Sequence, residues 1–381
     1  MNRAAQLSTF ADNDPGNPIL LCDLLDELLS SGHVEEARAR LNKAPAALRE
    51  LHGVRFRDAR CALLKGDAKT AIHLLLSLRA SMTEVPVGIV HDLAYAQFVD
   101  GQLQEAMSTL AKSSFQGEDA AVLALLKARI LHHQQQCNAA LEALAAHDSG
   151  SHAAEVRGMR SLLWLDLNNL EQAVAEAERA LALNAEQHHA SLVLGAAALR
   201  FQRADDATVV FKRVLAKHAD SGRAWLGLGH ASMLRGNVKV SRGEIERASE
   251  HMPEHIGTWH TLAWCQLMDD DLAAAEHSFE RAFALDRTFG ETHGGLAVIH
   301  AMRGKRKEAE DSIKRAMRLD PQGRSGRYAQ SLLLFAEGRV EEARNIVREL
   351  AKRAPNMSAS LTADYIFASC VGLSISGGEH G

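Results

Sequence analysis

The sequence predicts an all-α protein built as a stack of helical hairpins. Three observations predict this fold: a residue pattern that returns every 34 positions, a chain that is 46% hydrophobic but only 5% aromatic, and a count of seven prolines in 381 residues. The hydrophobic residues are mainly Ala and Leu, which favour helices over sheets. Few prolines leave room for long helices, and a fixed period of this length is typical of repeat architectures.

The 34-residue register runs without a gap from residue 154 to 357, in units that start at 154, 188, 222, 256, 290 and 324. The eighth and twentieth positions hold only small residues, namely Ser161, Gly195, Gly229, Ala263, Ala297 and Ser331, and Ala173, Ala207, Ser241, Ala275, Ala309 and Ala343. Positions twenty-four and twenty-seven are apolar throughout. Small residues let two helix backbones approach, and apolar residues three and four apart form one stripe. Each unit is therefore expected to be two antiparallel helices.

Turn residues and prolines punctuate the units. The turn between the two helices is predicted at Asn168, Gly236, Asp270, Gly304 and Gly338. The second helix is predicted to end before Pro253, Pro321 and Pro355, because proline lacks a backbone donor and disfavours helix in the residue before it.

Upstream, the same pattern continues more loosely, with units that begin near residues 18, 52, 87 and 121. This gives about ten units over residues 18–357. Residues 1–17 are expected to be flexible, since Pro15, Gly16 and Pro18 lie close to Asp12 and Asp14. Residues 358–374 are apolar and are expected to form a capping helix or a protein interface, and residues 375–381 a flexible tail.

The pattern resembles the tetratricopeptide repeat family. The residues that carry the resemblance are Trp225-x-x-Leu228-Gly229 and Trp259-x-x-Leu262-Ala263, followed by the small, apolar and proline positions above. The resemblance implies a right-handed α-α superhelix, a core position for the two tryptophans, and a concave groove lined by the first helix of each unit. It also implies that positions two, five, nine, twelve and thirteen of that helix face a bound peptide.

Mapped onto this chain, positions five and nine hold Phe56, His91 and Leu125, and Arg60, Tyr95 and Arg129, in units two to four. In the C-terminal half the groove is expected to be aromatic, aliphatic and histidine-rich. The candidate partner-binding residues are Arg129, Arg223, His230, His260, Trp264, Met268 and Tyr328. Trp264 has a second interpretation as a core residue, and Arg60 and Arg129 have one as partners of Asp26 and Asp92. The Lys and Asn set with which one class of the family grips chaperone carboxylates is absent.

Composition argues against several classes of partner. The formal net charge is −5 with both signs interspersed, so no positive field exists to attract nucleic acid. The first twenty residues lack the apolar run of a secretory signal, and no apolar run is long enough to span a membrane. Five scattered cysteines indicate buried thiols in a reducing compartment, so a cytoplasmic location is expected.

Motifs of catalysis or of metal binding are not apparent. Neither Gly-x-Ser-x-Gly nor a phosphate-binding Gly-x-x-x-x-Gly-Lys-Ser/Thr loop occurs. The histidine pairs His132-His133 and His188-His189 point to different sides of a helix, and Pro253 separates His251 from His255. We therefore expect no enzyme activity, no cofactor and no metal site.

The leading functional hypothesis is a non-enzymatic scaffold that holds a segment of a partner protein in the groove. The alternatives are an accessory or targeting module for an enzyme, and a peptide-sensing regulator. The apolar C-terminal helix also allows a homodimer.

Overall fold

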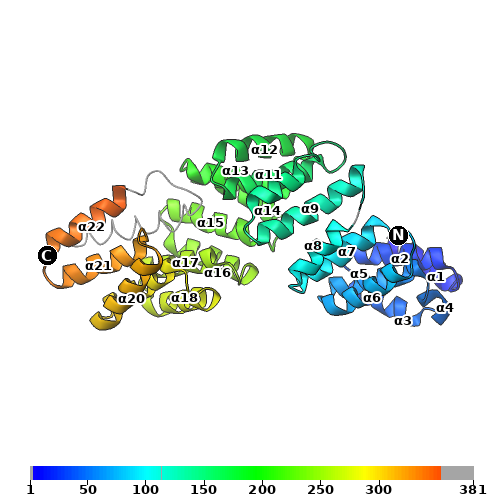
Figure 1. Cartoon of the computed structure of the whole chain (residues 1–381), viewed down its shortest axis with the longest axis horizontal. Helices are drawn as coiled ribbons and strands as arrows, with labels where there is room; N and C mark the ends of the chain where they lie inside the picture. The colour runs from blue at the N-terminus through cyan, green and yellow to red at the C-terminus, as the bar shows by residue number, and fades with distance from the viewer. Residues whose placement is uncertain (1–2, 113, 353–381) are drawn as a thin grey trace. The chain divides into compact units, whose positions relative to one another are not determined.

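The computed structural model describes residues 3–112 and 114–352 of the chain. These residues form 22 α-helices, and no strand occurs among them (Figure 1). The predicted all-α fold is confirmed. The predicted C-terminal helix and tail, the proposed dimer surface and Pro355 lie outside the described residues.

The chain divides into two compact units, residues 1–159 (unit 1) and residues 160–381 (unit 2). The helices of unit 1 are α1 (Arg3–Asn13), α2 (Pro18–Ser30), α3 (Val34–Lys43), α4 (Ala46–Arg49), α5 (His52–Leu64), α6 (Ala68–Ala80), α7 (Val87–Val99), α8 (Leu103–Ala111), α9 (Gly117–His133) and α10 (Cys137–Leu144). Helix α11 (Ala153–Asp166) crosses the boundary. The helices of unit 2 are α12 (Leu170–Leu183), α13 (His188–Arg200), α14 (Ala204–Leu215), α15 (Gly222–Leu234), α16 (Val238–His251), α17 (Ile256–Met268), α18 (Leu272–Leu285), α19 (Gly290–Met302), α20 (Arg306–Leu319), α21 (Arg324–Ala336) and α22 (Val340–Lys352).

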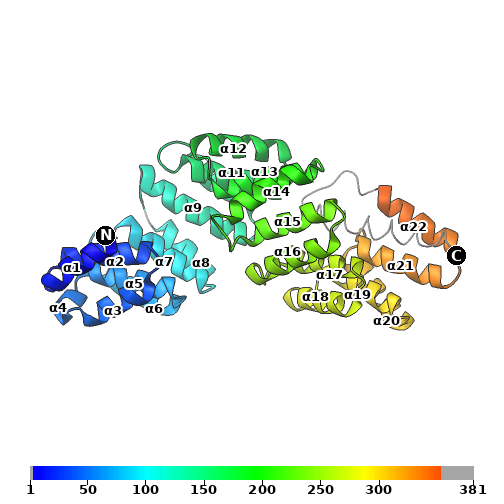
Figure 2. The same cartoon turned by 180° about the vertical axis from the view of Figure 1, so that it is seen from behind.

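Consecutive helices pair as hairpins in each unit (Figures 1 and 2). In unit 1, α5 packs on α6 and α7 on α8; in unit 2, α15 packs on α16, α17 on α18 and α19 on α20. The first helix of a hairpin also contacts the first helix of the next, as α5 contacts α7, α7 contacts α9, and α19 contacts α21. The first helices of each unit therefore form a continuous layer, as the repeat predicts.

The hairpin turns share one backbone geometry. At the end of α15, Gly236 N–H donates to the Met233 carbonyl and Asn237 N–H to the Ser232 carbonyl, which is a Schellman motif. Gly236 has φ +75°, a conformation that glycine adopts without strain. The predicted turn residues Asn168 and Asp270 adopt the same left-handed conformation with φ near +60°. The turn positions predicted from the sequence are confirmed within the described residues.

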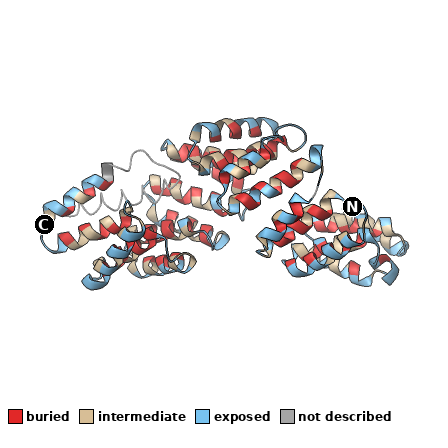
Figure 3. Ribbon diagram, viewed as in Figure 1, coloured by how far each residue is buried: buried red, intermediate tan, exposed pale blue. Residues whose placement is uncertain are grey.

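The small residues permit the close packing that the sequence predicts. The ring of Phe211 on α14 lies where the Cβ atoms of residues 195 and 227 would stand, so both positions must be glycine. A Cβ on Gly229 would likewise overlap the side chain of Ile245. Buried residues accordingly line one side of second helices such as α14 and α20, whereas first helices such as α17 are buried on most sides (Figure 3).

The N-terminal segment contains a helix. Residues 3–13 form α1, whose Leu7 packs with Ala4 and Ala11 against the leucine cluster of α2. Arg40 of α3 holds this helix through its ion pair with Asp12. Pro15 lies in the turn between α1 and α2, and Pro18 is the first residue of α2, which Asn17 caps. Residues 3–13 are thus helical, and the expectation that this segment is flexible stays a prediction.

Candidate partner-binding face

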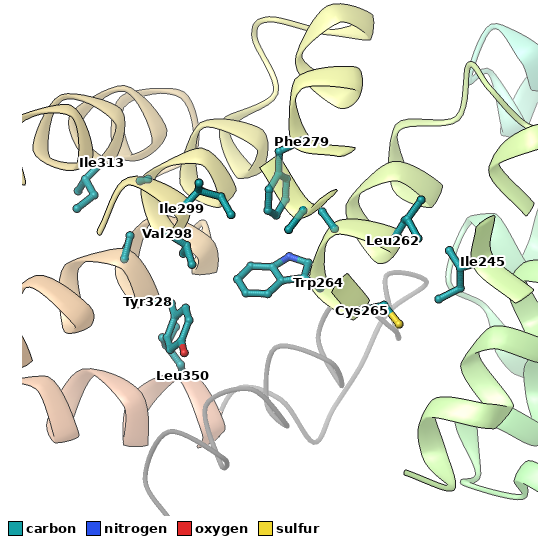
Figure 4. Packing of buried hydrophobic residues seen from close by; sticks show 14 of the residues in the cluster. Ile245, Leu262, Trp264, Cys265, Phe279, Val298, Ile299, Ile313, Tyr328 and Leu350 are labelled. Atoms are coloured by element: carbon teal, nitrogen blue, oxygen red, sulfur yellow. The ribbon is translucent and has the colours of Figure 1, made fainter. Parts of the chain in front are cut away.

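Two of the predicted binding residues in unit 2 belong to the hydrophobic core. The side chain of Trp264 is only 2% exposed, and its ring meets Phe279 edge-on at 5.9 Å between centroids. Tyr328 of α21 lies at 6.0 Å from the same indole and is also buried (Figure 4). Aromatic rings at these separations stabilise the packing of neighbouring repeats. Trp264 and Tyr328 thus belong to a hydrophobic core cluster, which agrees with the second interpretation of Trp264, and their role in partner binding stays a prediction.

The imidazole of His260, a third predicted binding residue, is also buried. Its Nε2 atom is hydrogen-bonded to the hydroxyl of Thr292 on α19 at 2.7 Å. The edge of the ring packs on Phe279 and Phe289, with centroid distances of 5.4 and 5.3 Å. Burial lowers the pKa of His260 to about 4, so the side chain is neutral at pH 7. This residue joins two repeats and offers little surface to a partner.

His230, Arg223 and Met268 lie nearer the surface of unit 2. His230 on α15 is half-buried, and burial lowers its pKa to about 3. Arg223 is exposed but forms an ion pair with Asp166, with 3.7 Å between Nη1 and Oδ1. Met268 is half-buried and packs against the cluster around Trp264. These three residues present a small, interrupted surface.

Trp225 and Trp259 occupy equivalent positions of two repeats and make the same set of contacts. Each indole N–H donates to the carbonyl of the residue six positions earlier, at 2.9 Å for Trp225 and 2.8 Å for Trp259. An arginine of the following helix covers each ring, with Arg247 and Arg281 at 5.1 and 5.2 Å from the two centroids. Both tryptophans are only partly buried, although they pack against core clusters. They fix the start of each first helix and are not free to bind a partner.

Unit 1 presents a more open surface on helix α5. Phe56, Arg60 and Leu64 follow one another at four-residue spacing, so they lie on one side of the helix. The guanidinium of Arg60 lies 6.0 Å from the centroid of the Phe56 ring. Leu64, one turn further on, is 55% exposed. The end of this stripe is therefore apolar and open to solvent.

Helix α7 shows the same arrangement one repeat later, still within unit 1. His91, Tyr95 and Val99 have the same four-residue spacing, and the rings of His91 and Tyr95 are stacked with centroids 6.4 Å apart. Tyr95 is 39% exposed and Val99 is 52% exposed. An ion pair between Arg60 Nε and Asp92 Oδ2, at 3.6 Å, joins this helix to α5. Leu64, Tyr95 and Val99 thus lie on adjacent helices.

Helix α9 extends the surface with Leu125, Arg129 and His133. Arg129 and His133 are exposed, and the His133 ring meets Phe98 of α7 edge-on at 5.4 Å. We call the exposed side of these three helices the first-helix face of unit 1, and define it by repeat positions five, nine and thirteen: Phe56, Arg60, Leu64, His91, Tyr95, Val99, Leu125, Arg129 and His133. Of the seven predicted binding residues, only Arg129 belongs to it.

Part of the chain matches a known family of repeats. The sequence model of the tetratricopeptide repeat family matches residues 303–358, which lie within the 34-residue register. A chain of the APC/C hetero-tetramer Cut9–Hcn1 has a similar fold, with a TM-score of 0.53 and 12% identity over 98% of this chain and 82% of that chain. Residues 303–358 therefore match the tetratricopeptide repeat family, and the fold of the chain is similar to that of the Cut9–Hcn1 chain. The tetratricopeptide repeat fold is typical of protein–protein interaction scaffolds.

Two shorter structures align with about half of this chain. One is YrrB, described as a TPR protein with an unusual peptide-binding site, at 19% identity over 49% of this chain and 96% of that chain, with a TM-score of 0.37. The other is MamA from Desulfovibrio magneticus RS-1, at 22% identity over 45% of this chain and 98% of that chain, with a TM-score of 0.33. No curated protein sequence matches the chain.

Metal-binding groups and membrane-spanning helices are two further features for which the described residues give evidence. Across residues 3–112 and 114–352, no three His, Cys, Asp or Glu side chains are grouped so that they would hold a metal ion. In the same ranges, no helix has both the length and the apolar content needed to cross a bilayer.

Proposed function

We propose that the chain is a non-enzymatic scaffold that binds a segment of a partner protein along the first-helix face of unit 1. The observation that carries the proposal is the exposure of Leu64, Tyr95 and Val99 on two adjacent first helices. A cluster of large apolar side chains left in water is characteristic of an interaction surface, because covering it is favourable. Tyrosine and arginine, both present on this face, are enriched among the residues that dominate binding energy.

The proposal moves the centre of binding from unit 2 to unit 1. In unit 2 the aromatic residues at the equivalent positions are used to join repeats, as Trp264 and Tyr328 are. Arg223 and Met268 keep part of their surface and remain candidates for a separate contact. The sequence places Phe56, Arg60, His91 and Tyr95 at groove positions, but it does not show which groove positions stay exposed.

The test is a triple substitution, Leu64→Ser, Tyr95→Ala and Val99→Ser, in the full chain. Wild type and variant are immobilised, and the proteins that each retains from a lysate of the source organism are quantified by mass spectrometry. We expect the variant to lose its specific partners by roughly tenfold or more, since it removes the apolar centre of the surface.

The matched control is Val209→Ser with Val240→Ser. These valines lie on the second helices α14 and α16 and are 59% and 56% exposed, so the control removes similar apolar area elsewhere. It should retain the partners of the wild type. Unchanged partners in the triple variant, with helicity equal to wild type by circular dichroism, would show that this face is not the binding site.

A further inference from the structure

Two carboxylates beside the first-helix face of unit 1, those of Asp26 and Asp92, are already paired with cations. Asp26 of α2 forms ion pairs with Arg57 and with Arg60, the latter at 3.9 Å. Arg60 reaches Asp92 of α7 as well, and His91 Nδ1 lies 2.9 Å from Asp92 Oδ1. This ladder of alternating charges runs across α2, α5 and α7, so its two carboxylates have little capacity left for cations of a partner.

Arg129 is the exception on this face. Arg129 occupies position nine of its repeat, as Tyr95 does in the preceding repeat. The side chain of Arg129 is exposed. It forms neither an ion pair nor a hydrogen bond with any residue in the described ranges. The Phe98–His133 contact holds α9 against α7, so Arg129 lies on the helix next to the one that carries Tyr95. The face therefore combines an exposed apolar centre with an unpaired positive charge at one side.

We infer that the partner segment is acidic and apolar: a carboxylate of an Asp or Glu pairs with Arg129, while its apolar side chains cover Leu64, Tyr95 and Val99. This inference rests on the proposed function and names the chemistry of the partner. Guanidinium groups bind carboxylates with two parallel hydrogen bonds, which fixes the register of the bound segment. A basic segment is disfavoured, because it would meet Arg129 and find Asp26 and Asp92 already paired.

The experiment uses a phage-displayed library of random peptides, selected on the immobilised full chain. We expect the selected peptides to combine Asp or Glu with large apolar residues. Synthetic copies, measured by fluorescence anisotropy, should bind Arg129→Glu roughly tenfold more weakly than wild type, and binding to wild type should weaken as salt is raised. Selection on Arg129→Glu should instead enrich Lys or Arg.

The control is Lys127→Glu, which makes the same charge change on the exposed surface of the same helix, two residues away. It should leave the affinity within about twofold of wild type. Peptides that depend on Tyr95, as shown by Tyr95→Ala, but carry no acidic residue and bind Arg129→Glu normally would overturn the inference and leave the proposed function intact. If no selected peptide depends on Leu64, Tyr95 or Val99, both fail.

Discussion

At the scale of single residues, buried polar groups link the repeats. His260 is 5% exposed, and its bond to Thr292 crosses from α17 to α19. Because burial penalises the charged imidazole, the folded protein holds this side chain neutral, with a pKa lowered from 6.5 to about 4. His260, although it occupies a groove position, thus links two repeats by a hydrogen bond, and its protonation is coupled to folding.

The first prediction concerns acid. The unfolded chain protonates His260 below pH 6.5, whereas the folded chain does so only near pH 4, so stability is complete above pH 6.5 and falls as the pH drops through this window. Between pH 7 and pH 5 this residue should cost about 2 kcal/mol of unfolding free energy. His260→Gln should show a smaller loss over that range in urea unfolding followed by tryptophan fluorescence. His277→Gln, which changes an exposed histidine of α18, should behave as wild type. Equal pH dependence in all three proteins would contradict the prediction.

At the scale of the element, helices pack closely because large side chains of one helix fill the space beside glycines of its neighbours. Phe211 projects from α14 between α13 and α15, and the Cβ of an alanine at position 195 would lie 2.6 Å from its ring. The small residues of the repeat are therefore matched to large ones on the partner helix. This part of the fold is readable from the sequence, because the small and large positions recur in fixed register.

The second prediction compares two glycine substitutions. Gly227→Ala should destabilise the protein by about 1–3 kcal/mol, because the new methyl group overlaps the Phe211 ring in a packed core. Gly243→Ala is the control: it lies exposed within α16 with no atom within 4 Å of the added Cβ. It should stabilise the helix by about 0.5–1 kcal/mol. Thermal unfolding followed by circular dichroism distinguishes the two, and a wild-type melting temperature for Gly227→Ala would show that the core can expand.

At the scale of the whole molecule, each repeat depends on its neighbours rather than on one central core. The buried residues form separate clusters along the chain, such as the leucine cluster of α2 and the cluster around Trp264. In such an array local stability follows the number and quality of neighbouring contacts. Stability is therefore expected to vary from one hairpin to another.

The third prediction follows from this variation. Helix α1 has no buried residue, whereas α17 has eight. Amide hydrogens of α1 should therefore exchange at least roughly tenfold faster than those of α17, as measured by hydrogen–deuterium exchange with mass spectrometry at neutral pH. Comparable protection in the two helices would mean that the array unfolds as one unit instead of repeat by repeat.

The candidate site was less predictable than the fold. Arg129 is exposed, as a groove position allows, whereas His260, Trp264 and Tyr328 are buried although their repeat positions suggest a groove surface. A repeat position gives the direction of a side chain from its own helix. It does not give the size of the side chains on the two adjacent repeats, and those decide whether the position is covered.

Tyr95 and Trp264 show which structural feature could not be predicted from the sequence. Both occupy position nine of a first helix, yet Tyr95 is 39% exposed and Trp264 only 2%. By itself the sequence determined the helices, their turns and the pairing of small with large residues, because these depend on neighbours a few residues or one repeat away. Only the tertiary structure decided which aromatic residue stays open, because Trp264 packs between Phe279 and Tyr328 whereas Tyr95 stacks on His91 of its own helix. Exposure is set by contacts that three consecutive repeats make together.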